Sequence, residues 1–445
     1  MVATCGWVLG PPKDRAQFNK VLPKNMPFSC INRNVGFDPV DPNFARIRDR
    51  PKWAIPWLED DPALIIPQLW AGRMRKDAAD ALKYGCTGLM GIHWRTRILG
   101  PNVSALAQAA WDQSTSSVME KPAQRDMPVA DFYADWAASQ FGPEVAAPIA
   151  MLFTRLDGGP LATGKRGRKS HLPRSSTWMQ GPGGIKPDDR AWEEVRLLYR
   201  FVDEMAALQS QVKGAGNIER FAYWLNNLRY LRAVARLNCT WARFNAAMKQ
   251  VKAENDPDAW ERLAHQIALP IRKELVAQVA DVHRYLLATV TTNGAMGNVA
   301  NWQQHIMPGL LTKTGQELAE ILGEELPAEA MPSKQYEGPL RIFVPTLRTS
   351  LEAGEDLKLK VVVLAQGRPK EAALYWRPMG KGKYKKITLN HVARGVYSAS
   401  LSAQEINRRD VEYYIEVISA AGDKQYFPAS APQINQTVVI TSGEE

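Results

Sequence analysis

Several features that mark large protein classes are scarce or absent in this sequence of 445 residues. The four cysteines, Cys5, Cys30, Cys86 and Cys239, are not paired at metal-binding spacing, and we interpret them as core thiols. No apolar run reaches the roughly 18–20 residues that cross a bilayer. A Walker loop, a Rossmann glycine fingerprint and a Gly-x-Ser-x-Gly elbow are also missing. The sequence therefore predicts no metal, no cofactor and no membrane partner.

The composition is that of an ordinary globular protein with a dispersed basic charge. Hydrophobic residues make up 45% and charged residues 23%, which excludes collagen, coiled coil and general disorder. Basic residues number 56 against 46 acidic ones. The densest basic run, between Lys165 and Arg174, holds five basic residues and no acidic one. We interpret it as a solvated loop; the alternative is a site for an anionic polymer, and no nucleic acid partner is expected.

The first residues, MVATCGWVLG, do not have the basic and apolar segments of a signal peptide. Localisation thus depends on whether Met1 is the true N-terminus. As written, the chain is expected to be cytoplasmic; a longer form with an upstream signal peptide would be secreted or periplasmic.

Three changes of pattern divide the chain, in line with roughly 100–200 residues per domain. Residues 1–128 alternate short strand-like runs with turns, and they contain one helical segment, Gln68 to Tyr84, that is expected to end at Gly85. Strand, helix and strand in this order are typical of a parallel βαβ unit. We interpret this part as a portion of a (β/α) barrel.

The remainder of the chain is predicted to be helical and then β-rich. Residues 129–335 contain apolar side chains at three- and four-residue spacing, above all between Phe221 and Phe244, which predicts a helical bundle interrupted by a basic loop at 157–187. Residues 336–445 contain seven short alternating runs, which predict an antiparallel β-sandwich of immunoglobulin or fibronectin type. The predicted fold class is α/β plus all-α plus all-β.

One strand-like run, CTGLMGIHWRTR, carries polar residues at its end. Period-two alternation divides its side chains into two faces: Met90, Ile92 and Trp94 on one, and Leu89, Gly91, His93 and Arg95 on the other. In a barrel we expect the first face to pack on the helices. His93 and Arg95 would then lie at the carboxyl mouth, where barrel active sites are built. The alternative is a His and an Arg that only pair with nearby carboxylates.

Carboxylates follow another strand, in RPKWAIPWLEDDPAL. Glu59, Asp60 and Asp61 raise one another's proton affinity, which suits a general acid or a nucleophile in glycosyl transfer. Glu59 is the leading catalytic candidate and Asp60 the second; a helix N-cap is the alternative role. Trp57 and Trp94 flank these groups and could stack on sugar rings or simply fill the core.

The order of these features resembles the C-terminal half of the catalytic barrel in large bacterial glycoside hydrolases, such as α-N-acetylglucosaminidases, α-glucuronidases and hexosaminidases. The resemblance covers about residues 1–330. It rests on Gly6-Trp7 at a first strand, a polar-ended second strand, a third ending at Glu59, GxxGIHWRTR at the last, and ADWAxxQFG beyond them. In that family the barrel is followed by a helical region.

The resemblance implies a place for each candidate residue. Trp7 would lie at the fifth barrel strand, Asn32 and Arg33 at the sixth, Glu59 or Asp60 at the seventh, and His93 with Arg95 at the eighth. The other catalytic carboxylate of several such barrels lies on the fourth strand. Because only about four strands fit before Arg97, we expect the first four to be missing, and the chain to self-associate or to be the C-terminal part of a longer enzyme.

The sequence therefore predicts a glycoside hydrolase, or part of one, that uses carboxylate acid/base chemistry. Its partner would be a carbohydrate, and the arginines Arg95 and Arg97 hint at an acidic or sulfated one. A non-catalytic carbohydrate-binding or structural protein is the alternative. The predicted substrate contacts are Trp7, Asn32, Arg33, Trp57, His93, Trp94 and Arg95.

Overall fold

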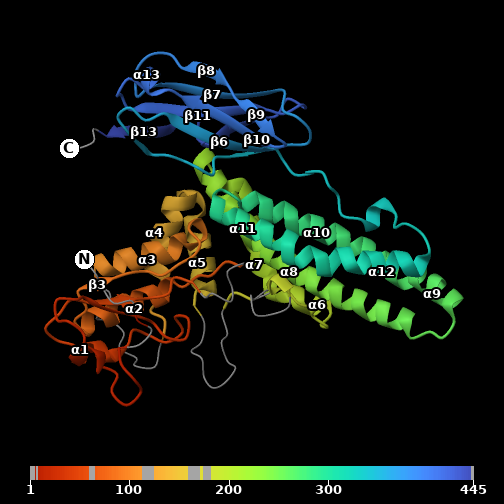
Figure 1. Cartoon of the computed structure of the whole chain (residues 1–445), viewed down its shortest axis with the longest axis horizontal. Coiled ribbons are helices and arrows are strands. Elements are labelled where there is room, and N and C mark those ends of the chain that lie inside the picture. Colours follow the sequence, from red (N-terminus) through yellow and green to blue (C-terminus); the bar gives the residue numbers. More distant parts are fainter. Residues whose placement is uncertain are drawn as a thin grey trace. The chain divides into compact units, whose positions relative to one another are not determined.

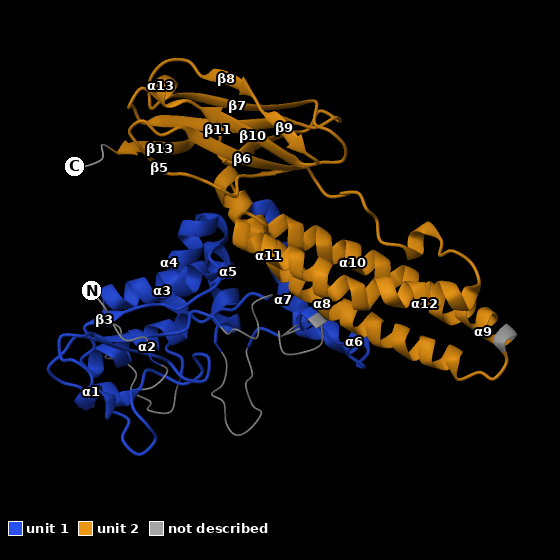
Figure 2. Ribbon diagram, viewed as in Figure 1, with its two compact units in different colours: residues 1–211 blue, residues 212–445 orange. Residues whose placement is uncertain are grey.

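The computed structural model describes residues 6, 9–59, 66–112, 125–158, 171–173 and 182–441 (Figure 1). The chain divides into two compact units, residues 1–211 and residues 212–445 (Figure 2). The strands form a parallel sheet in the first unit and mainly antiparallel sheets in the second. The predicted mixture of helix and sheet is therefore confirmed, whereas the boundaries predicted after residues 128 and 335 stay predictions.

A parallel sheet forms the centre of the first unit. Its strands are hydrogen-bonded in sequence order: β1 (Phe28–Ile31), β2 (Lys52–Ile55) and β3 (Gly88–Leu89). Isolated parallel bridges extend the pairing from Gly6 to Cys30 and from Trp57 to Ile92. Helix α2 (Ala71–Lys83) connects β2 to β3, which confirms the βαβ unit. Over the described residues the sheet is open, and a closed (β/α) barrel is not shown.

Helix α2 ends where the sequence predicts. Gly85 has a φ of +70°, a conformation that glycine adopts without strain. Its N–H donates to Leu82 O at 2.9 Å, and the Cys86 N–H donates to Ala81 O at 2.8 Å. These two bonds are the Schellman pattern, which closes a helix and turns the chain. The turn delivers the chain directly into β3.

The other helices of the first unit mostly follow the sheet in sequence. They are α1 (Phe18–Val21), α3 (Gly100–Trp111), α4 (Ala130–Phe141), α5 (Pro143–Leu156), α6 (Trp192–Val195) and α7 (Arg200–Ala206). Buried aromatic rings pack α4 on α5, with the Trp136 and Phe153 centroids 5.5 Å apart. Helix α4 ends at Gly142, as predicted, because its φ of +89° breaks the helix before Pro143.

Five helices begin the second unit: α8 (Ala215–Lys252), α9 (Pro257–Leu263), α10 (Leu269–Thr289), α11 (Asn293–Asn301) and α12 (Lys313–Leu322). The apolar stripe predicted between Phe221 and Phe244 is buried, which confirms the bundle core. A π-helical segment at 302–306 contains Trp302. This indole is fully buried and donates to the Tyr230 hydroxyl at 2.9 Å, so it belongs to the core.

Two sheets packed face to face complete the second unit, and they confirm the predicted antiparallel region. One sheet has the order β4 (Arg341–Phe343), β6 (Leu357–Leu364), β10 (Val396–Leu401), β9 (Asn390–Ala393). The other has the order β5 (Ser350–Glu352), β13 (Gln436–Thr441), β11 (Val411–Ile418), β7 (Glu371–Pro378), β8 (Lys385–Thr388), with β12 (Lys424–Phe427) paired to β11. A short helix, α13 (Ala403–Ile406), precedes β11.

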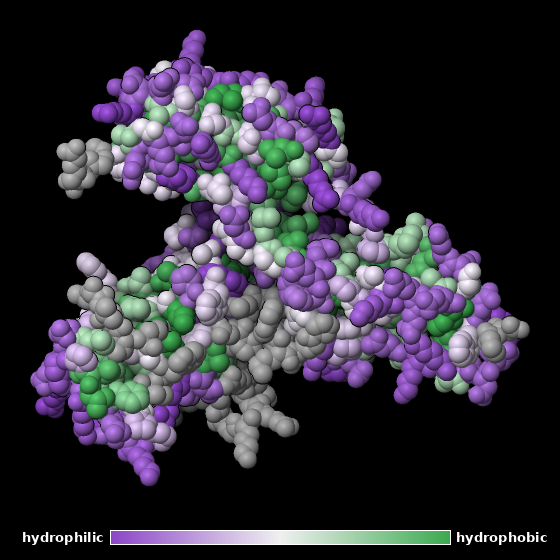
Figure 3. All heavy atoms as spheres, viewed as in Figure 1, coloured by the Kyte–Doolittle hydropathy of each residue, from purple (hydrophilic) through white to green (hydrophobic). Residues whose placement is uncertain are grey.

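The apolar core between these two sheets explains why buried and outward-facing side chains alternate along their strands. Leu359 and Val361 of β6 are buried against Leu374 and Trp376 of β7, while the residues between them point outward. All seven predicted strands are present, and the short strands β5, β9 and β12 add to them. Hydrophilic side chains cover most of the visible outer surface of this sandwich (Figure 3).

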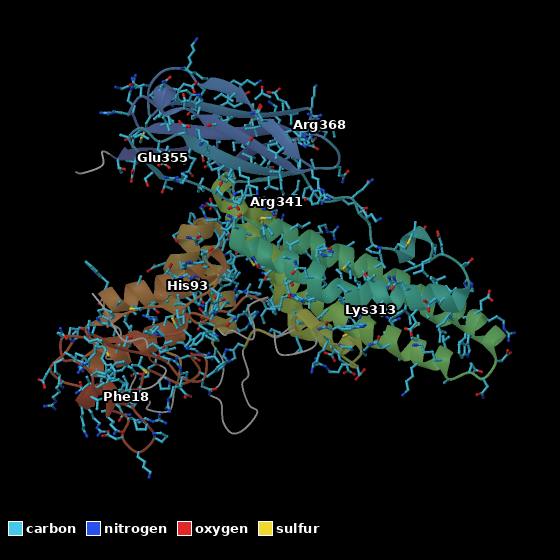
Figure 4. The ribbon with its side chains drawn as sticks, viewed as in Figure 1. Phe18, His93, Lys313, Arg341, Glu355 and Arg368 are labelled. Carbon is cyan, nitrogen blue, oxygen red and sulfur yellow. The ribbon has the colours of Figure 1, made fainter. Side chains whose placement is uncertain are left out.

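Within the second unit, Arg341 joins the sandwich to the helices. Its guanidinium donates to the carbonyl oxygens of Leu287 and Val290 at the end of α10 (Figure 4). Leu287 O also accepts the Val290 N–H at 3.3 Å. Carbonyl oxygens in the last turn of a helix lack the N–H donors that interior carbonyls have, so a cation is a favourable additional donor to them. Phe343 and Val362 pack beside Val290 and give the junction an apolar centre.

Candidate functional site

Glu59 is the central residue of the candidate site, although it is completely buried. It follows β2, and its Oε1 accepts the backbone N–H groups of Trp94 at 2.7 Å and Arg95 at 2.9 Å. Its Oε2 accepts Nε–H of Arg95 at 2.5 Å. Glu59 thus fastens the segment after β3 to the segment after β2.

Arg95 completes this arrangement. Its Nη1 donates to Ile66 O at 2.8 Å, while its Nη2 is buried and has no hydrogen-bond partner among the described residues. A buried ion pair is stable only when its remaining hydrogen-bonding groups are satisfied. Both oxygens of Glu59 are satisfied and one nitrogen of Arg95 is not. The unsatisfied group of this ion pair is therefore a buried donor of Arg95, and the carboxylate of Glu59 has no oxygen left without a partner.

This geometry bears on the predicted catalytic role of Glu59. A general acid or nucleophile must present an oxygen to the substrate, and both oxygens here are already occupied by Arg95 and the backbone. For proton transfer, Arg95 would first have to release the carboxylate. Asp60, the second catalytic candidate, lies outside the described residues.

His93 and Trp94 are exposed at the end of the last strand. The Trp94 side chain is 58% exposed, although its backbone N–H is fixed by Glu59. His93, labelled in Figure 4, is held by a hydrogen bond of 2.8 Å between its Nδ1 and Arg95 O, and its ring is exposed. An exposed indole on an immobilised backbone is a suitable surface for stacking a planar or apolar face of a ligand.

Of the face predicted to pack on the helices, only Ile92 packs inward, against the buried cluster that contains Trp57 and Trp70. Leu89 packs with Ala81 of α2, and Gly91 lies against Leu58 and Leu106, so the Leu89–Gly91 face meets the helices. Met90 is 47% exposed on the opposite face, which also carries Trp94. The physical reason is the glycine: without a Cβ, Gly91 allows Leu58 and Leu106 to pack directly on the strand, as a Cβ there would lie 2.9 Å from Leu58 Cδ1.

The other predicted contacts fall in three different environments. Trp57 is buried in the core, where its indole N–H donates to Asn32 O at 2.8 Å, so its ring faces are not exposed. Asn32 is also buried, and its Nδ2 has no hydrogen-bond partner among the described residues. Arg33 is exposed, with its Nε 3.9 Å from Asp38 Oδ2. Trp7 lies outside the described residues.

A buried charged cluster on α2 was not predicted. Asp77 accepts Arg125 Nη2 at 2.9 Å, and Arg125 also donates to Gly36 O and Phe37 O, in the loop after β1. Burial raises the pKa of Asp77 to about 6, against the opposing effect of Arg125. Arg73, one turn earlier on α2, lies over the Trp70 ring at 4.3 Å from its centroid. In the sequence, the signal for this cluster was the i, i+4 spacing of Arg73 and Asp77, which places the two charged residues on the same face of a helix.

Asp157 binds the beginning of α2 from the end of α5. Its carboxylate accepts the N–H groups of Ala71 at 2.8 Å and Gly72 at 3.1 Å, and the Tyr133 hydroxyl at 2.7 Å. The first N–H groups of a helix have no acceptor within it, so Asp157 caps α2 from a distance. Burial raises the pKa of this carboxyl to about 7.

Metal binding and membrane insertion have no structural support in the part of the chain that the structure describes. Within the described ranges, no group of three His, Cys, Asp or Glu side chains is placed to hold a metal ion. None of the helices described is both long and apolar enough to span a bilayer.

Comparison with known proteins gives no family assignment. No family model and no curated protein matches the chain. Among solved structures, an endo-β-1,4-mannanase from Thermotoga petrophila is 9% identical, with a TM-score of 0.20 over 93% of this chain and 97% of that one. An engineered protein is 10% identical, with a TM-score of 0.18 over 39% of this chain, and the match spans 45% of that protein. TM-scores this low do not establish a shared fold.

Replacing Glu59 with Gln is expected to lower the free energy of unfolding by about 3 kcal/mol. The amide would put an N–H₂ group against the donors of Arg95 and the backbone, and would leave the guanidinium buried without its counter-ion. Urea unfolding followed by circular dichroism measures this change. The control is Glu371→Gln, whose carboxylate pairs with Lys386 at the surface, and which should leave the midpoint unchanged. Equal effects of the two substitutions would contradict a buried anchor at Glu59.

Replacing Asp157 with Asn is expected to remove part of the pH dependence of stability. Because its pKa is raised from 3.8 to about 7 in the folded protein, folding favours the protonated carboxyl. The resulting stabilisation is complete below pH 4 and is lost as the pH rises toward 7, by at most about 1.4 kcal/mol per pH unit. Urea unfolding of both proteins at four pH values from 4 to 7.5 measures the difference. A difference that does not vary with pH would show that Asp157 does not titrate in this range.

Proposed function

We propose that the protein binds carbohydrate at the carboxyl edge of its parallel sheet, in the manner of a glycoside hydrolase. Trp94 is the stacking surface, and its neighbour His93 is a polar contact; Arg33, exposed in the segment after β1 of the same sheet, is a further one. The observation that carries this proposal is the combination of an exposed indole and a fixed backbone at Trp94. Because Glu59 already orders this segment, little conformational freedom is lost when a sugar stacks on the ring.

Unsatisfied donors support the same conclusion and indicate an acidic sugar. Asn32 Nδ2 and Arg95 Nη2 are both buried without a hydrogen-bond partner among the described residues, and both belong to segments that follow strands of the sheet. An unsatisfied buried donor costs about 1–3 kcal/mol. Both groups can only donate and both are shielded from solvent, so a ligand that satisfies them must displace the groups that cover them and offer oxygen acceptors. Sugar hydroxyls supply these, and a uronic carboxylate supplies them with a charge that matches the guanidinium.

Hydrolysis by Glu59 is the second candidate function. It is favoured by the position of Glu59 in the segment after β2, since open α/β sheets bind their ligands at the carboxyl ends of the strands. It is opposed by the three hydrogen bonds that already occupy the carboxylate. The structure therefore favours binding over Glu59-dependent turnover in this chain.

Trp94→Ala is expected to weaken binding of acidic oligosaccharides by roughly ten-fold, because stacking on the indole is lost. Isothermal titration with oligogalacturonate, and with a neutral manno-oligosaccharide for comparison, measures the affinity. Trp111→Ala is the matched control, because that indole at the end of α3 is 94% exposed and outside the site. Undiminished affinity in Trp94→Ala, or equal losses in the two variants, would reject Trp94 as the stacking surface.

Release of reducing ends from the same oligosaccharides decides between binding and hydrolysis. If Glu59 is catalytic, the wild-type chain produces reducing ends and Glu59→Gln does not, while Arg95→Lys retains part of the activity. Circular dichroism of each variant shows whether it is folded at the assay temperature. Binding without hydrolysis by the wild-type chain would reject the second candidate.

A further inference from the structure

A cluster of tyrosines lies on the outer surface of the larger sheet of the sandwich. Tyr375 of β7 and Tyr414 of β11 are direct cross-strand partners, and their neighbours Trp376 and Tyr413 point inward to the core. Tyr426 of β12 and Tyr384, in the turn before β8, complete the set. We refer to Tyr375, Tyr384, Tyr414 and Tyr426 as the tyrosine face; β7 lies between β8 and β11 in this sheet (Figure 1).

The four rings form one continuous aromatic group. The Tyr375 and Tyr414 rings are stacked, with centroids 4.9 Å apart and planes 5° apart. The Tyr384 ring meets Tyr414 edge-on at 5.1 Å, and Tyr426 lies 6.2 Å from Tyr414 on a tilted plane. All four side chains are only half-buried. Aromatic cross-strand pairs stabilise a sheet, and a partly exposed group of this kind is also a candidate surface for a ligand or partner.

Basic side chains cover the rings and extend beyond them. The Arg377 guanidinium lies 4.4 Å from the Tyr384 centroid, and Lys386 Nζ lies 5.7 Å from that of Tyr375. The acidic residues of this surface are paired: Glu371 with Lys386, Glu412 with Arg377 at 2.7 Å, and Glu416 with Lys424 at 3.6 Å. Their charges are therefore largely compensated within the surface.

The turn between β7 and β8 adds positive charge next to the tyrosine face. The segment MGKGKYKKIT from Met379 to Thr388, which comprises this turn and β8, contains four lysines and no acidic residue. Lys381 and Lys383 are exposed on this turn. The tyrosine face is consequently bordered by uncompensated basic groups, which attract an anionic partner.

We infer that the tyrosine face and its lysine turn bind an anionic polysaccharide. Phenol hydroxyls and ring edges contact sugar hydroxyls and C–H groups, and the lysines pair with carboxylate or sulfate groups along the chain. This is a second carbohydrate-binding surface, separate from the site of the first unit. It does not require that site to function.

The orientation of the rings favours a polysaccharide over a nucleic acid. Single-stranded nucleic acids bind by stacking bases on open aromatic faces. Here one face of Tyr375 is stacked on Tyr414 and Lys386 lies over the Tyr375 ring, so edges and hydroxyls are what the ligand meets.

Binding of polygalacturonate to the full chain, compared with its methyl-esterified counterpart, tests this inference. The measurements are made in the Trp94→Ala background, where the first carbohydrate site is weakened, and any further loss caused by a substitution in the sandwich is assigned to the sandwich. We expect polygalacturonate to bind, and the uncharged methyl ester to bind at least ten-fold more weakly at low salt. The affinity should fall as salt is added, as for other ligands held by several lysines.

Two variants and a matched control locate the contact. Lys381→Ser/Lys383→Ser and Tyr384→Ser should each weaken polygalacturonate binding several-fold. Lys358→Ser/Lys360→Ser removes two equally exposed lysines from β6 of the opposite sheet and should have no effect. The inference would be overturned if the lysine double variant of the turn or Tyr384→Ser kept full affinity, or if the β6 control lost as much affinity as they did. Equal binding of the methyl ester, or stronger binding of single-stranded DNA, would overturn it as well.

Discussion

A carboxylate that is removed from water has to find all of its hydrogen bonds within the protein, and the candidate site depends on how Glu59 meets this requirement. It accepts two backbone N–H groups and one guanidinium N–H, all from Trp94 and Arg95. The segment after β3 consequently has little freedom to move away from β2. The position of the Trp94 indole and the direction of the remaining Arg95 donor both follow from this one ion pair.

Local patterns in the sequence were sufficient to predict most of the secondary structure. The alternation of apolar residues located the seven main strands of the sandwich, and Gly85 and Gly142 located the ends of two helices. These features depend on a few neighbouring residues and on the φ that glycine allows. Glu59 and Arg95 were also recognised as candidate residues, because polar groups at the ends of buried strands are uncommon without a partner or a function.

Features set by packing between distant segments could not be predicted in the same way. Alternation separates the two faces of the strand that contains β3, but the packing of Leu58 and Leu106 on Gly91, and of Ile92 on the cluster of Trp57 and Trp70, depends on distant segments. In the same way, Trp57 became a core residue because neighbouring strands and loops cover it. The Asp77–Arg125 pair joins residues 48 positions apart, and a single sequence carries no trace of that contact.

The distance along the chain between Asp157 and the helix that it caps has a consequence for assembly of the first unit. The βαβ segment pairs strands that are close in sequence, whereas Asp157 reaches back 86 residues to Ala71. Contacts of large sequence separation close late, after the local ones have formed. Helix α2 therefore acquires its cap only when α5 docks. A chain shortened at residue 128 would retain every strand of the sheet and still leave the beginning of α2 without its acceptor.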